Sequence, residues 1–494
     1  MPAKKRAVRH KATGSGATKS GARRNGTTGG GATRSGTARN EAARSGSAHG
    51  RGPSKTSAAV RSGLTAETVR RKHGDFLLPC VKNYYREPLV LVEGNGRHVT
   101  DIDGMSYLDF FGGILTVSIG HAHPRVNAAV KEQIDRLTHV STLYQTLPMV
   151  ELAETIAKIT PGKLARSFFT SSGTEADETG VMLSQIYTGR LEIVALRHGY
   201  SGRSLLAQAL TAHSPWRLVP TQIAGIKHAA SPYCYRCTFG LKYPSCSVRC
   251  ALDIEELIRT TTVGKIAGFL AEPIQGVGGF ITPPKEYFKI AVDIVRRYGG
   301  VFICDEVQTG FGRTGGKMFG IEHFGVLPEI MTMAKGVANG IPLGVTVATP
   351  EVADSLSGLS ISTFGGNPVS CAAALATIGV IKDEGLPAHV DKVGKVLRSG
   401  LLRLKDRFPR LIGEVRGMGL IQAIEIVEDE TRGDRTPNVD ATLALFEETK
   451  KRGLLIGKGG LYGNVVRISP PLTVTKNEVE RALEIFGDSF EAIV

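Results

Sequence analysis

The chain has 494 residues, which is enough for a large buried core and two domains. No apolar run reaches membrane-spanning length and no secretory hydrophobic region is present, so the composition excludes an integral membrane protein and predicts a cytoplasmic one. The formal net charge of +15 is concentrated in residues 1–63, where five Lys and nine Arg stand against one acid, Glu41. That segment contributes +13, so the high isoelectric point says nothing about residues 64–494.

Residues 1–63 consist mainly of Gly, Ala, Ser, Thr and Arg. Because such a segment cannot bury enough apolar surface to offset the entropy lost on ordering, we predict a disordered tail. The tail has three interpretations: an inert extension, which is favoured, a basic arm with weak non-specific contacts to nucleic acid, and a transit peptide that lacks an amphipathic face. A nucleic-acid-binding protein that acts through this tail is therefore an alternative function from a different class.

Two segments thirty residues apart indicate the chemistry. The five mostly apolar residues Gly300-Val-Phe-Ile-Cys304, followed by the acidic pair Asp305-Glu306, predict a buried strand of a parallel sheet that presents Asp305 at its carboxyl end, where open α/β sheets bind ligands. Lys335 follows the apolar run 330–334 and precedes small residues, and a lysine that is desolvated there can act as a nucleophile. A pyridoxal phosphate enzyme needs a Schiff-base lysine and a carboxylate that keeps the pyridine nitrogen protonated. Lys335 and Asp305 could supply this pair, the alternatives being a solvated loop lysine and a strand-end cap.

The surrounding motifs identify a family resemblance. The stretch Asp-Glu-Val-Gln-Thr-Gly-Phe-Gly-Arg-Thr-Gly at 305–315, followed by Ala-Lys-Gly at 334–336, resembles the class III (omega) aminotransferases of the fold type I pyridoxal phosphate enzymes. The similarity runs from about residue 75 to the end, and several motifs appear in the family's order. It implies an α/β fold, with a large domain around a mostly parallel central sheet and a smaller α+β domain.

The resemblance also implies a domain organisation. The expected parts are the tail (1–63), an N-terminal segment that packs with the small domain (64–117), a large domain that binds pyridoxal phosphate (118–366) and a C-terminal small domain (367–494).

A phosphate site is expected where the strand 166–170 meets a helix through Ser171-Ser-Gly-Thr-Glu175. Free N–H groups at a helix start attract a phosphate, although this pattern is also a common helix cap. Placed before Asp305 in the chain, it resembles the family's cofactor-phosphate cup. Ser172, Gly173 and Thr174 are therefore expected to bind the cofactor.

Further cofactor-binding residues follow from the resemblance. Tyr200 is expected to stack on the pyridine ring, although Ser201 replaces the family's usual histidine. Glu272 matches the family pattern, and Gln308 is expected to hold the phenolic oxygen. Thr363 matches a threonine that reaches the cofactor phosphate of the other subunit, which implies an obligate homodimer.

Two arginines are candidates for binding the substrate. Arg203 matches the position at which 4-aminobutyrate-type members bind a carboxylate, and Arg467 matches a C-terminal arginine of the family. Ornithine- and 4-aminobutyrate-type members commonly have a glutamate that pairs with this arginine, but Val277 stands here. Without that glutamate, Arg467 would stay free to bind an α-carboxylate, which favours a small keto acid as acceptor.

Four cysteines form a cluster in the sequence: Cys234, Cys237, Cys246 and Cys250. Their short spacing is compatible with a zinc ion or an iron–sulfur cluster. Reduced surface cysteines or a reversible disulfide are the alternatives, so the sequence leaves the metal open.

The sequence therefore predicts a two-half transamination. Lys335 would move the proton between substrate and cofactor, and Asp305 would stabilise the protonated ring. The expected donor is an ω-amino acid such as 4-aminobutyrate or β-alanine, or an alanine-like amine, and the expected acceptor is pyruvate, glyoxylate or 2-oxoglutarate. A racemase or a decarboxylating transaminase would use the same two residues and remains an alternative.

Overall fold

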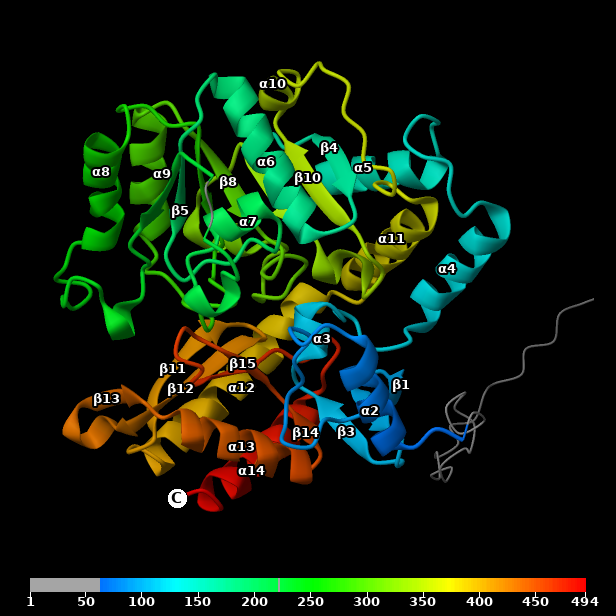
Figure 1. Ribbon diagram of the computed structural model, residues 1–494, viewed down its shortest axis with the longest axis vertical. Helices are drawn as coiled ribbons and strands as arrows, with labels where there is room; N and C mark the ends of the chain where they lie inside the picture. The colour runs from blue at the N-terminus through cyan, green and yellow to red at the C-terminus, as the bar shows by residue number, and fades with distance from the viewer. Residues whose placement is uncertain (1–62, 221–222) are drawn as a thin grey trace, which may run out of the picture. The chain divides into compact units, whose positions relative to one another are not determined.

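The computed structural model describes residues 63–220 and 223–494, and these residues form three β-sheets with helices around them (Figure 1). The predicted disordered tail lies outside the described residues, apart from Gly63. Within the described ranges, none of the helices combines the length and apolar character that crossing a membrane requires.

The central sheet has seven strands in the order β4-β10-β9-β8-β7-β5-β6. Neighbouring strands are parallel except where β10 pairs with β4 and β9. Most of these strands are buried at every position, as expected for a sheet covered on both faces. The strands are β4 (Arg166–Thr170), β5 (Ile193–Leu196), β6 (Ile226–Ala229), β7 (Gly268–Ala271), β8 (Val301–Asp305), β9 (Ile330–Met333) and β10 (Gly344–Ala348).

Helices cover this sheet on both faces. Helix α6 packs across the middle strands, and Gly180 makes this possible, because an added Cβ would stand 3.1 Å from Ile303 Cγ2. Helices α8 and α9 lie side by side at the β5 end of the sheet (Figure 1). The helices of this part are α4 (Pro124–Arg136), α5 (Leu147–Ile159), α6 (Gly173–Thr188), α7 (Leu205–Leu210), α8 (Arg249–Thr261), α9 (Tyr287–Arg297) and α10 (Pro350–Ala353).

An aromatic core fixes the strands that carry the acidic residues of interest. Phe269 of β7 and Phe302 of β8 stack with ring centroids 5.7 Å apart, and Phe288 of α9 packs on Phe302 at the same distance. This packing holds the carboxyl ends of β7 and β8 next to each other. It therefore positions Glu272 and Asp305, which stand at those ends.

The C-terminal part contains an antiparallel sheet of order β11-β12-β16-β15, with β13 paired to β12. Helix α12 packs on α14 and on strand β11. The strands are β11 (Ile412–Met418), β12 (Ile421–Asp429), β13 (Asp434–Pro437), β15 (Gly457–Gly459) and β16 (Val465–Ile468). The helices are α11 (Pro368–Asp383), α12 (Leu386–Arg407), α13 (Val439–Lys451) and α14 (Lys476–Glu491).

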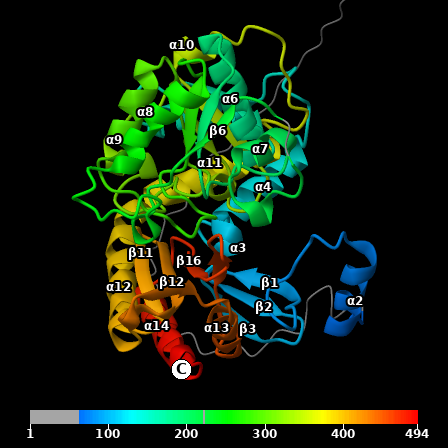
Figure 2. The same ribbon diagram turned by 60° about the vertical axis from the view of Figure 1, so that its left-hand side comes forward.

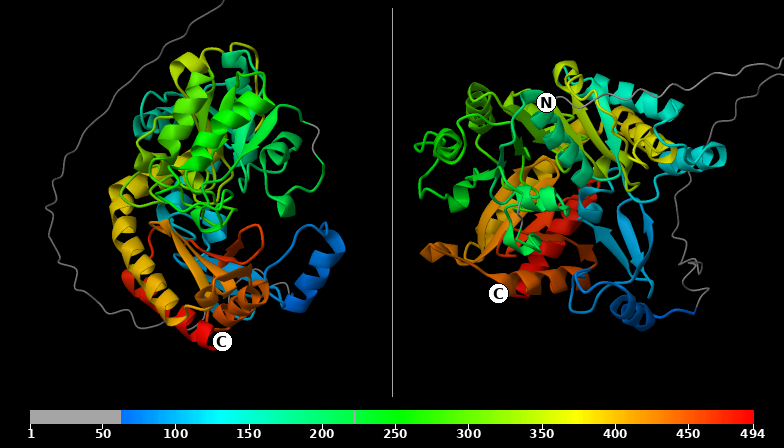
Figure 3. Two further views of the ribbon diagram at one scale, coloured as in Figure 1. Left: turned by 90° about the vertical axis from the view of Figure 1, so that its left-hand side faces the viewer. Right: turned by 45° about the horizontal axis from the view of Figure 1, so that its top comes forward.

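The N-terminal strands join this C-terminal part rather than the central sheet. Strand β14 (Leu454–Leu455) pairs in parallel with β3, and Glu447 of α13 accepts a hydrogen bond from the Arg86 amide at 2.6 Å. Figure 2 and Figure 3 show the first strands beside the C-terminal helices. The elements of this segment are α2 (Ala66–Phe76), β1 (Leu91–Asn95), β2 (His98–Asp101), β3 (Ser106–Asp109) and α3 (Gly112–Leu115).

Candidate active site

A cavity of about 850 Å³ opens at the carboxyl ends of the central strands. Segments from the N-terminal strands, the central sheet and the C-terminal sheet line it together. The expected site residues on its wall are Ser172, Gly173, Thr174, Tyr200, Asp305, Gln308, Lys335 and Arg467. The structure therefore brings together residues that lie almost 300 positions apart in the sequence.

The start of helix α6 forms one wall of the cavity. Ser172 is the N-cap residue, and its hydroxyl accepts a hydrogen bond from the Glu175 amide at 3.3 Å. The first helical amides, those of Gly173 and Thr174, have no acceptor within the helix, which leaves them to bind an anion. Loop residue Gly202 touches this wall, since an added Cβ would stand 2.0 Å from Thr174 Oγ1.

Asp305 and Lys335 follow adjacent parallel strands. Asp305 ends β8, is almost fully buried, and accepts a hydrogen bond from the Val307 amide at 2.9 Å. Lys335 begins the short 3-10 turn Lys335–Ala338 after β9, with a φ of +44° that is uncommon for a residue with a side chain. Burial lowers the pKa of Lys335, and the charges of Asp305 and Glu272 oppose that shift. Burial raises the pKa of Asp305, while the Val307 amide and the charge of Lys335 lower it.

Tyr200 and its neighbours form the aromatic side of the cavity. The ring of Tyr200 meets Trp216 edge to face, with centroids 5.7 Å apart. Glu272 does not line the cavity but lies behind this loop, where it accepts hydrogen bonds from the amides of Tyr200 at 3.3 Å and Gly276 at 2.7 Å. Burial raises the pKa of Glu272 to about 8. Glu272 thus fixes the loop that presents Tyr200.

Gln308 and Arg467 face each other across the cavity floor. Arg467 donates a hydrogen bond to Gln308 Oε1 at 2.7 Å, which leaves the Gln308 amide nitrogen to donate elsewhere. The guanidinium carbon of Arg467 lies 4.6 Å from the ring centre of Phe280 and 5.2 Å from that of Phe111. Burial lowers the pKa of Arg467 to about 10.

Besides Glu272, two further expected site residues do not line this cavity. Arg203 is exposed and stands outside the cavity wall, so the described chain does not bring it to Lys335. Thr363 is also exposed and absent from the wall formed by its own chain.

Asp177 and Trp216 are among the wall residues that sequence reasoning missed. Asp177 stands four residues after Gly173 on α6, so helical spacing alone would place it on the same face of the helix. Trp216 lies in an irregular segment, and no local pattern indicates that it approaches Tyr200.

The four clustered cysteines line a separate small pocket and are all free thiols. Burial raises the pKa of Cys234 to about 11 and that of Cys250 to about 12. In the part of the chain that the structure describes, no group of three or more His, Cys, Asp or Glu side chains is arranged to hold a metal ion. The metal interpretation of this cluster therefore receives no support from the structure.

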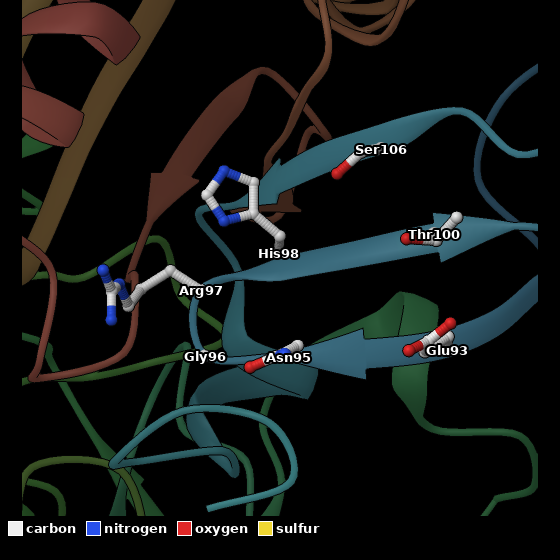
Figure 4. A pocket seen from close by; sticks show the side chains of 7 residues that line it. All are labelled: Glu93, Asn95, Gly96, Arg97, His98, Thr100 and Ser106. Carbon is white, nitrogen blue, oxygen red and sulfur yellow. The ribbon is translucent and has the colours of Figure 1, made fainter. Parts of the chain in front are cut away.

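Another hollow, of about 410 Å³, lies over strands β1, β2 and β3 (Figure 4). Its polar wall includes Glu93, Thr100 and Ser106, one from each strand. None of the expected site residues lies there, so the chemistry belongs to the cavity beside Lys335.

The wall chemistry fits pyridoxal phosphate. A helix start suits a phosphate, a buried carboxylate suits a pyridinium nitrogen, and a desolvated lysine suits a Schiff base. The fold and this set of groups define a fold type I pyridoxal phosphate enzyme. The model of the family described as "Aminotransferase class-III" matches residues 81–490. The chain belongs to the class III aminotransferases and uses pyridoxal 5'-phosphate.

Known proteins resemble the chain over most of its length. It is 43% identical to alanine–glyoxylate aminotransferase 2 homolog 2, mitochondrial, of Arabidopsis thaliana over 424 residues. These matched residues make up 86% of this chain and 87% of that protein. It is 38% identical over 434 residues to alanine–glyoxylate aminotransferase 2, mitochondrial, of Homo sapiens, which covers 84% of each. An amine transaminase from an uncultivated Pseudomonas species, solved in its PLP-bound form, is similar with a TM-score of 0.79 at 32% identity, covering 85% of this chain and 99% of that one.

Proposed function

We propose that this aminotransferase takes its amino group from an ω-amino acid of the 4-aminobutyrate or β-alanine kind, or from alanine. The acceptor is a small 2-oxo acid such as glyoxylate, pyruvate or 2-oxoglutarate. Two relatives named as alanine–glyoxylate aminotransferases support alanine as donor and glyoxylate as acceptor, and a relative from Bacillus subtilis named as a probable 4-aminobutyrate aminotransferase supports an ω-amino acid donor. A racemase or a decarboxylating transaminase is the alternative that the same lysine and aspartate allow.

The observation that carries the proposal is how few hydrogen bonds the buried guanidinium of Arg467 makes. Within residues 63–220 and 223–494, its one hydrogen-bonding partner is the neutral Gln308 amide, and its Nε has no partner. A buried guanidinium without a carboxylate is available to grip the carboxylate of a substrate through two hydrogen bonds. Arg467 and Lys335 line the same cavity, so this carboxylate would lie within reach of the reacting group.

Val277 accounts for the free guanidinium. An added Cβ on Gly459 would stand 2.5 Å from Arg467 Cδ and 3.2 Å from the Val277 carbonyl oxygen, so the side chain of Arg467 and the backbone of Val277 both lie beside Gly459. Val277 lines the cavity with a side chain that cannot form an ion pair. Arg467 therefore does not have to release a carboxylate of its own before it binds a small 2-oxo acid.

Every expected site residue except Arg203 has a role in this proposal. When bound, the cofactor withdraws electrons from the carbon whose proton is removed. Lys335 takes that proton and returns it, helped by a pKa that burial lowers. An ionised Asp305 would accept a hydrogen bond from the ring nitrogen and keep that nitrogen protonated, and the Gln308 amide nitrogen would donate to the phenolic oxygen.

The remaining residues position the ring. The α6 amides at Gly173 and Thr174, with Ser172 as the residue that caps the helix, would bind the phosphate, and Tyr200 would cover one face of the ring. Glu272 acts by fixing the Tyr200 loop. The proposed domain boundaries assign these residues to the large domain, 118–366, with Arg467 supplied by the small domain, 367–494, and the segment 64–117 packed on the latter.

Replacing Arg467 with glutamine is expected to raise the KM for glyoxylate or pyruvate about a hundredfold while kcat changes much less. The reason is that removing one partner of a buried charged pair costs about 2–5 kcal/mol of binding energy. Steady-state kinetics with a fixed amine donor measure this effect. If Arg203→Gln raises that KM and Arg467→Gln leaves it unchanged, the exposed arginine binds the carboxylate and the proposal fails.

The variant Val277→Glu tests whether a carboxylate at position 277 blocks Arg467, and Val277→Leu is its matched control. A carboxylate at this position would face Arg467 and compete with the acceptor, so the KM for pyruvate should rise. Val277→Leu keeps an apolar side chain there and should leave the KM close to that of the natural chain.

The proposal includes a homodimer with shared active sites. Thr363 is exposed and lies among the exposed apolar residues Leu359, Ile361 and Phe364, which a second copy would cover. Light scattering on the purified full-length chain is expected to give twice the chain mass. A monomer that keeps full activity would contradict the role of Thr363.

A cytoplasmic location is also part of the proposal. The alternative is a mitochondrial location, because both alanine–glyoxylate aminotransferase relatives are named as mitochondrial. In that case residues 1–63 would act as a transit peptide. Fusing a fluorescent protein to the full chain and to residues 64–494 tests this, because a transit peptide would separate the two. Weak nucleic-acid contact through the tail falls outside the described residues.

A further inference from the structure

A second buried carboxyl group lies beside Asp305. Asp177, on the first turns of α6, is 1% exposed and lines the cavity. Its Oδ1 accepts a hydrogen bond from Thr332 Oγ1 at 2.6 Å. Thr332 of β9 pairs directly with Asp305 of β8 in the sheet, and its carbonyl accepts a hydrogen bond from the Glu306 amide at 2.9 Å. Asp177 is therefore fixed over the end of strand β8.

Acidic groups outnumber basic ones around the pair Asp177 and Asp305. The acidic groups that face Asp177 are Asp305 and Glu272, and the basic group is Lys335. Two neighbouring carboxylates in a buried site repel each other, so one of them holds a proton. Thr332 already donates to Asp177, but this single neutral hydrogen bond does not offset a buried charge.

The proton belongs to Asp177 rather than to Asp305. Burial and the charge of Asp305 raise the pKa of Asp177 well above its usual range. Asp305 has more stabilising partners, since the Val307 amide and the charge of Lys335 both lower its pKa. A protonated oxygen of Asp177 would have an acceptor in Asp305, which lines the same cavity, while the other oxygen accepts from Thr332.

We propose that Asp177 is a neutral carboxylic acid that donates a hydrogen bond to Asp305 and keeps Asp305 ionised. Asp177 is a positioning residue, because it acts on the cofactor through Asp305. A hydrogen bond to a carboxylate makes it less basic, so Asp305 leaves the proton on the cofactor ring nitrogen rather than taking it. The second half of this inference rests on the role proposed for Asp305.

The chain offers a matched pair of variants. Asp177→Asn keeps the geometry, since the amide nitrogen can donate to Asp305 while the amide oxygen accepts from Thr332. Asp177→Leu has a similar size but provides neither group. The affinity for pyridoxal phosphate, measured by titrating the cofactor-free full chain, is expected to stay within about threefold for Asn and to fall at least tenfold for Leu. In addition, at the same pH the absorbance of the cofactor bound to the Leu variant should show a smaller fraction with a protonated ring than in the natural chain.

An infrared spectrum of the cofactor-free full chain tests the protonation directly. The carbonyl band of a buried carboxylic acid is expected in the natural chain and lost in Asp177→Asn. The same band should shift in Thr332→Val, which removes the hydroxyl that donates to Asp177. Glu272 and Glu306 have pKa values raised to about 8 and about 7, so the spectra are recorded above pH 8, with Glu272→Gln and Glu306→Gln as controls.

The outcomes separate this inference from the proposed function. If the carboxylic-acid carbonyl band is equally strong in the natural chain and in Asp177→Asn, Asp177 is ionised and the inference is wrong, whatever the enzyme's substrates. Equal loss of cofactor affinity in the Asn and Leu variants would also overturn it, because the negative charge would then be the property that matters. If instead Asp305→Asn binds the cofactor as the natural chain does, the role proposed for Asp305 fails while the infrared result still stands.

Discussion

Replacing Lys335 with alanine is expected to lower kcat by about three orders of magnitude or more while the chain still folds and binds pyridoxal phosphate. Lys335 lies on the cavity wall after strand β9, and its charge lowers the pKa of Asp305. A positioned acid–base group contributes about 10²- to 10⁴-fold to a rate, and this lysine also makes the covalent link to the cofactor. Single-turnover kinetics with an amine donor measure the loss.

Covalent labelling provides the control for Lys335. After borohydride reduction, mass spectrometry should find the cofactor on the peptide that contains Lys335 in the natural chain and on no peptide of Lys335→Ala. Lys317→Ala removes an exposed lysine from outside the cavity and should retain both labelling and activity. A Lys335→Ala chain with more than a tenth of the natural kcat would contradict the assignment.

Replacing Asp305 with asparagine is expected to lower kcat about 10²- to 10³-fold, the effect of removing a preorganised electrostatic partner from a buried site. The substitution preserves the shape of the side chain and its acceptor for the Val307 amide, so the melting temperature should change little. Steady-state kinetics and the pH dependence of the cofactor absorbance measure the effect. An Asp305→Asn chain that works within tenfold of the natural chain would show that another group keeps the ring protonated.

The sequence predicted those parts of the site that depend on local patterns. Continuous apolar runs indicated β8 and the position of Asp305 at its end, and the strand is confirmed with residues 301–305. The hydroxyl and glycine residues before α6 predicted a helix start, and Ser172 caps that helix. Helix α11 begins at Pro368 and α14 at Lys476, where the side chains of Asn367 and Thr475 cap the first turn.

The remaining parts depend on contacts between distant segments. Arg203 matched a family position, but its loop directs it to the surface. Glu272 matched another, yet it hydrogen-bonds to the loop behind Tyr200 instead of reaching the cavity wall. The cysteine spacing suggested a metal, although spacing does not fix how thiols from a turn and a helix face each other. The link between Asp177 and Asp305 passes through Thr332 of a third element, and no local pattern could predict it.

Absorbance of the purified full-length chain during addition of substrates tests the central claim most directly. The visible band of bound pyridoxal phosphate should bleach with alanine, 4-aminobutyrate or β-alanine. It should return with glyoxylate, pyruvate or 2-oxoglutarate, with one amino group transferred per site in each half-reaction. A chain that takes up no pyridoxal phosphate, or one whose band never bleaches while it interconverts amino-acid enantiomers, would contradict transamination at Lys335.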